Sequence, residues 1–252
     1  MKYSLVIALM ITALTWGGWT LVDEPLPAGS PGPESEALAD EVLAAIHYDA
    51  WRRTGVVEWT FAGKREHLWD RQRHWARVQW DDYTVWVDLT LHRGCAERDG
   101  HMLDAEQVQP LVEKAWAFWA NDSFWLNPLA KVRDSGTERS LVNLEDGRRG
   151  LLVSYRTGGV TPGDSYLWAV DADGQVQYGK MWVQVFPLGG MRFDWFNWIE
   201  LATGARIALQ HDGPIAVDLS EVRAAYELSE LYPQQDPFLL LEDRIGSESA
   251  AR

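Results

Sequence analysis

Apolar and polar residues alternate with a period of two along much of the chain, which is the pattern of strands with one buried face. The clearest run extends from Tyr83 to Leu91, where odd-numbered residues are apolar and the other face holds polar residues and Trp86. Because tight turns such as 171–174 and 202–204 join consecutive runs, the strands are expected to be antiparallel. The pattern predicts about eight or nine strands in two blocks. They are expected at 57–61, 65–69, 75–80, 83–91, 151–156, 165–170, 175–186, 191–201 and 205–211.

Three segments have the apolar spacing of a helix instead. The first lies within 34–51, and the second is an apolar stripe over 108–119. Trp116 and Trp119 end this stripe, so we expect the sheet to bury both indoles. A last helix is expected at about 220–231, where a proline soon follows.

Together these elements predict a mainly β, α+β fold. We expect a single twisted antiparallel sheet, an open half-barrel that wraps around the 108–119 helix and buries its apolar stripe. A sandwich of two sheets is the alternative, but it leaves this helix without a place to pack. The half-barrel domain is expected at 35–232, after a proline-rich tether at 23–34 and before a C-terminal tail at 233–252.

The first 22 residues predict export to a membrane or across it. Lys2 is followed by a segment without charges from Tyr3 to Val22, which is typical of a signal peptide. About 20 apolar residues also suffice to span a bilayer, so an uncleaved anchor in the inner membrane is an alternative to the signal peptide. A buried N-terminal helix of the domain is a third alternative. Lys2 before the segment and Asp23 and Glu24 after it predict that the domain is periplasmic or otherwise extracytoplasmic.

Charge and cysteine content exclude several kinds of partner and cross-link. The formal net charge of −14 at pH 7 argues against a nucleic-acid partner, because such a surface repels phosphates. Cys95 is the only cysteine in the sequence, so no disulfide can form within the chain, and no cysteine follows the apolar segment for lipid attachment. Stability must therefore come from the core.

Three short motifs do not follow from the strand and helix patterns. They are His67–Asp70 in the second strand, the segment 121–126 (NDSFWL), where we expect a turn, and the segment 159–166 (GVTPGDSY). The second motif continues with Pro128, Lys131, Asp134 and Gly136. These motifs resemble a family of exported bacterial proteins of unknown function, and the match covers roughly residues 45–212.

The order of elements carries a second, architectural resemblance. A helix, a sheet block, a central helix and a second sheet block are similar to the half-barrels of LolA-type lipoprotein carriers. Those proteins bind acyl chains in the concave face of the sheet, which implies an apolar ligand here. No LolA motif residue matches a position of this sequence, and the tryptophan content is different.

The tryptophan content itself needs an explanation, since 13 of the 15 tryptophans lie beyond the leading segment. Core filling is one explanation. However, each buried indole needs a partner for its N–H, so a ligand-lined concavity is the other. The candidate contacts for a ligand are Trp59, Trp116, Trp119 and Trp125.

Candidate catalytic and metal-binding groups are sparse. Glu66, His67, Asp70 and His74 are close in sequence, but strand alternation puts His67 on the face opposite Glu66 and Asp70. No zinc or nucleophile motif is present, and Cys95 has only His92 and His101 near it in sequence. We therefore expect no metal and no cofactor, and find no grounds in the sequence to name an enzyme.

These observations predict a non-enzymatic cell-envelope protein that binds an apolar or amphipathic ligand, such as a lipid or acyl chain, in the concave face of the sheet. A protein- or glycan-interaction module with an exposed tryptophan face, docking an envelope partner, is the alternative. A hydrolase with an unrecognised site is the third interpretation.

The predicted compartment can be tested with reporters fused after Arg252. We expect fused alkaline phosphatase to be active and a fused cytoplasmic reporter to be inactive, because the domain should follow its leader across the membrane. The opposite pattern would show that the domain stays in the cytoplasm.

Overall fold

The computed structural model describes residues 23–250 except 158–161 and 186–187. The predicted leader at 1–22 lies outside this range. Among the described residues, no helix combines the length and apolar character needed to cross a bilayer. The chain divides into two compact units: the first includes 23–48, 127–198 and 208–217, and the second includes 49–126, 199–207 and 218–250.

The strands of the described chain form one antiparallel sheet of 13 strands, in the order β6-β5-β4-β3-β2-β1-β13-β12-β11-β10-β9-β8-β7. The sheet is not closed into a barrel, since β6 and β7 end the order. The strands are β1 (Val56–Phe61), β2 (Arg65–Asp70), β3 (Trp75–Trp80), β4 (Tyr83–Asp88), β5 (Arg93–Arg98), β6 (His101–Met102), β7 (Thr137–Asn143), β8 (Arg149–Tyr155), β9 (Ser165–Val170), β10 (Val176–Trp182), β11 (Met191–Glu200), β12 (Arg206–Asp212) and β13 (Val217–Ala225).

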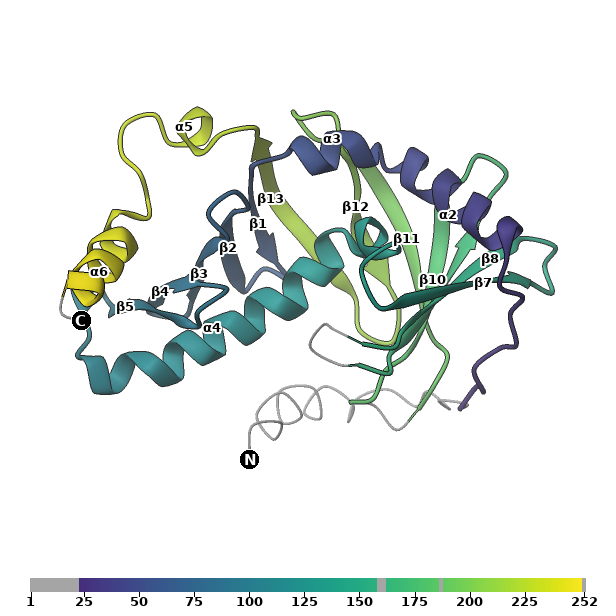
Figure 1. Cartoon of the computed structure of the whole chain (residues 1–252), viewed down its shortest axis with the longest axis horizontal. Helices are drawn as coiled ribbons and strands as arrows, with labels where there is room; N and C mark the ends of the chain where they lie inside the picture. Colours follow the sequence, from purple (N-terminus) through teal and green to yellow (C-terminus); the bar gives the residue numbers. More distant parts are fainter. Residues whose placement is uncertain (1–22, 158–161, 186–187, 251–252) are drawn as a thin grey trace. The chain divides into compact units, whose positions relative to one another are not determined.

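This architecture confirms the predicted class, an α+β fold built on one open antiparallel sheet. The helical elements are α2 (Pro33–Ala45), α3 (Tyr48–Arg53), α4 (Ala105–Leu126), the 3-10 helix η1 (Pro128–Lys131), α5 (Leu228–Leu231) and α6 (Leu239–Ala250), most of them labelled in Figure 1. The sequence pattern missed four strands, β5, β6, β7 and β13.

In the second unit, α4 packs against one face of β3, β4 and β5. Alternate strand residues such as Val85 and Val87 are fully buried there against Val112 and Ala115 of the helix. The predicted burial of Trp116 and Trp119 is only partial, because both indoles pack at the border of this cluster. We call this the helix-covered face.

The expected turn at 121–125 is wrong, because α4 continues through Leu126. Polar residues that form turns in isolation can stay helical when their side chains have partners elsewhere. Asp122 is fully buried and accepts hydrogen bonds from Arg65 and His67 of β2, besides one from the neighbouring Asn121. A long-range contact therefore overrides the local preference.

The helix predicted at 220–231 is also wrong over most of its length, since 217–225 form β13, which pairs with β1. The register shifts once between the two strands, opposite Glu58–Thr60, and Glu221 there has a φ of 53°. The extra residue of such a bulge breaks the alternation of apolar residues. The broken alternation has the spacing of a helix, which explains the error.

The C-terminal segment covers the second face of this sheet. Phe238 and Leu241 are completely buried against Val56, Leu68 and Trp86, which point away from α4. We call this the outer face. Residues expected to form a tail thus include α6 and part of the core.

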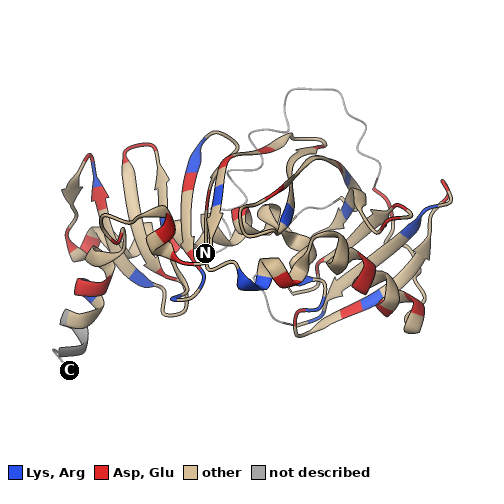
Figure 2. Cartoon of the chain, turned by 90° about the horizontal axis from the view of Figure 1, so that it is seen from above, with Lys and Arg blue, Asp and Glu red and all other residues tan. Residues whose placement is uncertain are grey.

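In the first unit, α2 packs against β7 and β8. The helix buries an apolar stripe, and ion pairs join Glu36 to Arg139 and Glu41 to Arg149. Figure 2 shows acidic and basic residues interspersed along strands and helices. Part of the predicted tether also contacts this unit, because Ser30 forms a β-bridge with Leu141.

The packing of the C-terminal segment can be tested with two neighbouring residues. Phe238→Ala should lower the free energy of unfolding by about 3–5 kcal/mol, as is typical of a buried aromatic residue. Leu239→Ala is the matched control, because Leu239 is 41% exposed, and it should cost about 0.5 kcal/mol or less. Equal losses in urea unfolding would contradict the packing of Phe238 on the outer face.

Candidate functional site

A buried polar network joins α4 to β2 in the second unit. The Asp122 carboxylate accepts hydrogen bonds from Arg65 Nε at 2.6 Å and Nη2 at 2.8 Å. His67 Nε2 lies 2.7 Å from the same carboxylate, and the His67 ring stacks on Trp59 with 4.6 Å between ring centroids. The network thus joins two of the sequence motifs, His67–Asp70 and the segment that begins at Asn121.

Burial and hydrogen bonding compete in setting the charges of this network. Burial acts to raise the pKa of Asp122, but the hydrogen bonds from His67 and Arg65 outweigh it and hold that pKa below its ordinary value. Burial also lowers the pKa of His67, against the opposite effect of Asp122. Asp122 is therefore ionised at neutral pH, paired with Arg65, while His67 is neutral.

The centre of the network, His67 and Asp122, is closed to solvent, which argues for a structural role. The side chains of His67 and Asp122 are both 0% exposed. The described residues offer no hydrogen-bond partner to His67 Nδ1 or Trp59 Nε1. A substrate could not reach these groups, so we assign the network to docking α4 on the sheet.

The candidate cluster in the sequence around His67 does not assemble. Glu66 is exposed, and Asp70 accepts hydrogen bonds from Arg73 and from the backbone of the following turn. In the described part of the chain, no group of three or more histidine, cysteine or acidic residues could hold a metal ion. Burial raises the pKa of the Cys95 thiol to about 11, so it is protonated at neutral pH.

The four tryptophans predicted as ligand contacts lie in different surroundings. Trp59 is only 1% exposed, and Trp116 Nε1 donates a hydrogen bond to the Leu89 carbonyl. Trp119 packs edge-on against Trp69 at 5.2 Å, and Trp125 is half-buried near the end of α4. None of the four lines the groove described next, and their role in binding stays a prediction.

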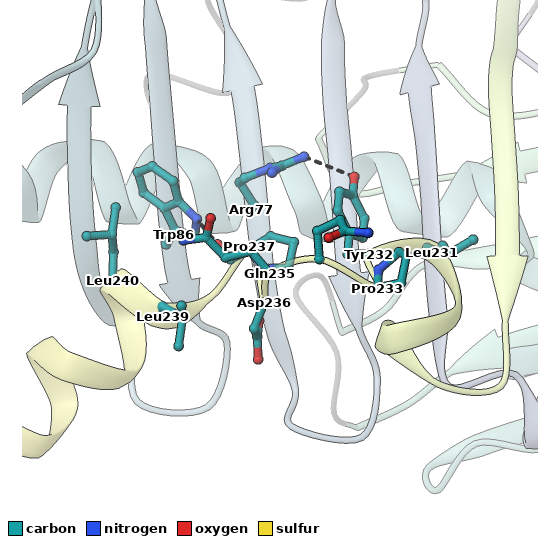
Figure 3. Close-up of a pocket in the computed structure, with 11 residues that line it drawn as sticks. Arg77, Trp86, Leu231, Tyr232, Pro233, Gln235, Asp236, Pro237, Leu239 and Leu240 are labelled. Atoms are coloured by element: carbon teal, nitrogen blue, oxygen red, sulfur yellow. Dashed lines mark hydrogen bonds between the residues drawn. The ribbon is translucent and has the colours of Figure 1, made fainter.

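A groove of about 510 Å³ lies on the outer face of the second unit (Figure 3). Its floor is Arg77 of β3 and Trp86 of β4, which face each other across the two strands. The segment 231–240, which we call the strap, forms the wall of the groove. The strap residues that line it are Leu231, Tyr232, Pro233, Gln234, Gln235, Asp236, Pro237, Leu239 and Leu240.

Two sets of contacts hold the strap on the sheet. Trp86 Nε1 donates a hydrogen bond of 2.7 Å to the Pro237 carbonyl. Arg73 donates from Nη1 and Nη2 to the two carboxylate oxygens of Asp236, at 2.7 and 3.1 Å. The Asp236 carboxylate points away from Arg77 in Figure 3. Because Trp86 and Arg73 both hold the strap on the sheet, the groove is a preformed space.

A polar group closes one end of the groove. The Tyr232 hydroxyl donates to Glu58 Oε2 at 2.6 Å and accepts from Arg77 Nη2 at 3.3 Å. Leu239 and Leu240, which are 41% and 42% exposed, lie at the other end (Figure 3). The groove therefore combines an apolar end with a basic one, which suits an amphipathic molecule.

The sequence contains one signal for this site. Trp86 stands on the polar face of the 83–91 alternation, between Thr84 and Asp88. An indole on a solvated face of a strand indicates that another segment covers it. The identity of that segment could not be deduced, because the strap lies about 150 residues further along the chain.

Removing the buried charge tests the structural role of the network. Asp122→Asn should cost roughly 3 kcal/mol of stability at neutral pH, because it leaves Arg65 without its partner in a mostly buried site. Glu66→Gln is the matched control on the same strand, and it should be close to neutral because Glu66 is exposed. A small effect of Asp122→Asn in urea unfolding would contradict this role.

Comparisons with known proteins leave the family of the chain open. No family model and no curated protein matches it. Among solved structures, it is similar to a DUF1329 family protein from Desulfovibrio piger ATCC 29098, with a TM-score of 0.39 and 13% identity over 80% of this chain and 97% of that chain. The family suggested by the sequence motifs and the LolA-type resemblance both stay predictions.

Proposed function

We propose that this protein is a non-enzymatic binding protein of the cell envelope, and that the strap groove holds its apolar or amphipathic ligand. The observation that carries the proposal is the groove itself. Its volume of about 510 Å³ falls within the range of roughly 300–1,000 Å³ typical of small-molecule sites. Its lining is mostly apolar and aromatic.

The exposed leucines of the strap supply the driving force. Leu239 and Leu240 are each more than 40% exposed at the edge of the groove. A ligand that covers them removes apolar area from water, which contributes about 25 cal/mol per Å². The strap is already held by Trp86 and Arg73, so binding does not have to order it.

The proposed envelope address comes from the leader. An uncharged segment after Lys2, followed by Asp23 and Glu24, supports an extracytoplasmic domain, as a periplasmic protein or one anchored in the inner membrane. Apolar and amphipathic molecules are abundant at membranes, so this address and the groove agree. Another envelope protein is the partner proposed besides the ligand.

Binding can be measured with the neutral apolar probe N-phenyl-1-naphthylamine and the full-length chain. We expect the fluorescence of the probe to saturate. Leu240→Ser should lower the affinity for the probe roughly five-fold, since the variant removes part of the apolar surface. Leu91→Ser is the matched control, because Leu91 is 57% exposed outside the groove, and it should bind like the wild type.

Two results would count against the strap groove. Absence of saturable binding would reject the ligand-binding function and leave the interaction module as the better interpretation. Binding that is unchanged in Leu240→Ser but weakened in Trp125→Ala would place the ligand at the tryptophans predicted from the sequence.

A further inference from the structure

We infer that the ligand of the strap groove is a single-chain amphiphile with a monoanionic oxyacid head, and that Arg77 binds this head. The inference rests on the proposed function and adds the chemical class of the ligand. It follows from the way Arg77 is placed, from the charges around it and from the direction of the groove.

Arg77 lacks the partners that a half-buried arginine normally has. Its Nη2 atom donates one long hydrogen bond, 3.3 Å, to the Tyr232 hydroxyl. Its Nε atom is buried and has no acceptor among the described residues, and no described carboxylate forms an ion pair with it. A buried guanidinium N–H that donates no hydrogen bond, such as that of Arg77 Nε, is costly.

Other partly buried arginines of this protein do have carboxylate partners. Arg93, 28% exposed, lies 3.7 Å from Asp88. Three more have side chains that are 18–29% exposed and lie within 2.8 Å of a carboxylate oxygen. They are Arg65 with Asp122, Arg73 with Asp70 and Asp236, and Arg139 with Glu36. Arg77 differs from them in facing a groove rather than a carboxylate.

The nearby carboxylate of Glu58 already has two other hydrogen-bond partners. Glu58 accepts from Tyr232 with one oxygen and from Arg223 Nε, at 2.5 Å, with the other. Farther along the strap, Asp236 shares Arg73 with Asp70, which adds negative charge there. The charges of Glu58 and Arg223 cancel, so the end of the groove at Tyr232 keeps the single positive charge of Arg77. One negative charge on a ligand balances it, which favours a monoanion over a dianion.

The groove also sets the direction of the ligand. The Arg77 guanidinium points toward Tyr232, whereas Leu239 and Leu240 lie at the other end of the strap (Figure 3). The planar guanidinium offers paired donors that match the oxygens of a carboxylate or a phosphodiester. The head therefore lies at Arg77, and the chain extends along the strap over Trp86 toward the leucines.

The test compares single-chain ligands with different heads, on the full-length chain at pH 8; dodecanoate and dodecanol share the same chain length. Displacement of N-phenyl-1-naphthylamine is measured for dodecanoate, dodecanol and lysophosphatidylglycerol. The affinity for dodecanoate should be at least about ten-fold higher than for dodecanol, because only the anion forms a charge-assisted hydrogen bond. Lysophosphatidylglycerol carries a phosphodiester head instead of a carboxylate. The anion that binds more tightly shows which of the two heads the groove recognises.

Variants assign this preference to Arg77. Arg77→Gln should abolish the preference for the anions over dodecanol, and its urea unfolding curve shows whether the variant folds. Arg77→Lys should keep a reduced preference, since it retains the charge without the fork. Arg53→Gln, which removes one charge from an exposed site, should behave like the wild type.

The outcomes separate the two proposals. If dodecanol and both anions bind equally well, or if Arg77→Gln keeps the preference, the inference is wrong and the proposed function stands. If neither dodecanol nor the neutral probe binds, the proposed function itself fails. A preference that is lost in Arg77→Gln and kept in part in Arg77→Lys supports both.

Discussion

Both faces of the sheet in the second unit have to be covered, because large apolar side chains project from both. Val85 and Val87 point to one face and Trp86 to the other, as strand alternation requires. One amphipathic helix, α4, covers only the first face. The C-terminal segment covers the second, with Phe238 and Leu241 buried against the sheet. The strap groove exists because this second cover is a narrow segment rather than a full layer.

The buried charge on the helix-covered face has partners of opposite charge, whereas the cation Arg77 on the outer face has none among the described residues. This contrast supports a binding function for the outer face. On the helix-covered face, Asp122 is held by Arg65 and His67, so the buried charge is compensated. On the outer face, Arg77 has a hydroxyl as its only described hydrogen-bond acceptor. Compensated charges fit docking of a helix, whereas an uncompensated cation beside an apolar groove fits recognition of an anion.

Two errors in the sequence-based prediction have the same physical origin. The segment 121–125 contains turn-forming residues but stays helical because Asp122 bonds to β2. The segment 217–225 has the spacing of a helix but forms β13 because β1 offers it a ladder to pair with. In both cases, a partner far away in sequence outweighs a local preference of less than about 1 kcal/mol per residue.

The sequence by itself determined the class of the fold, since the period of apolar residues records which face of a strand or helix is buried. It also determined the helix at 108–119 and drew attention to His67 and Asp122 through their motifs. The tertiary structure alone decided what covers the outer face and which cation lacks a partner. Arg77 meets Tyr232 across 155 residues, and Glu58 meets Arg223 across 165. Local periodicity holds no information about such pairs, because they depend on how the whole sheet is assembled.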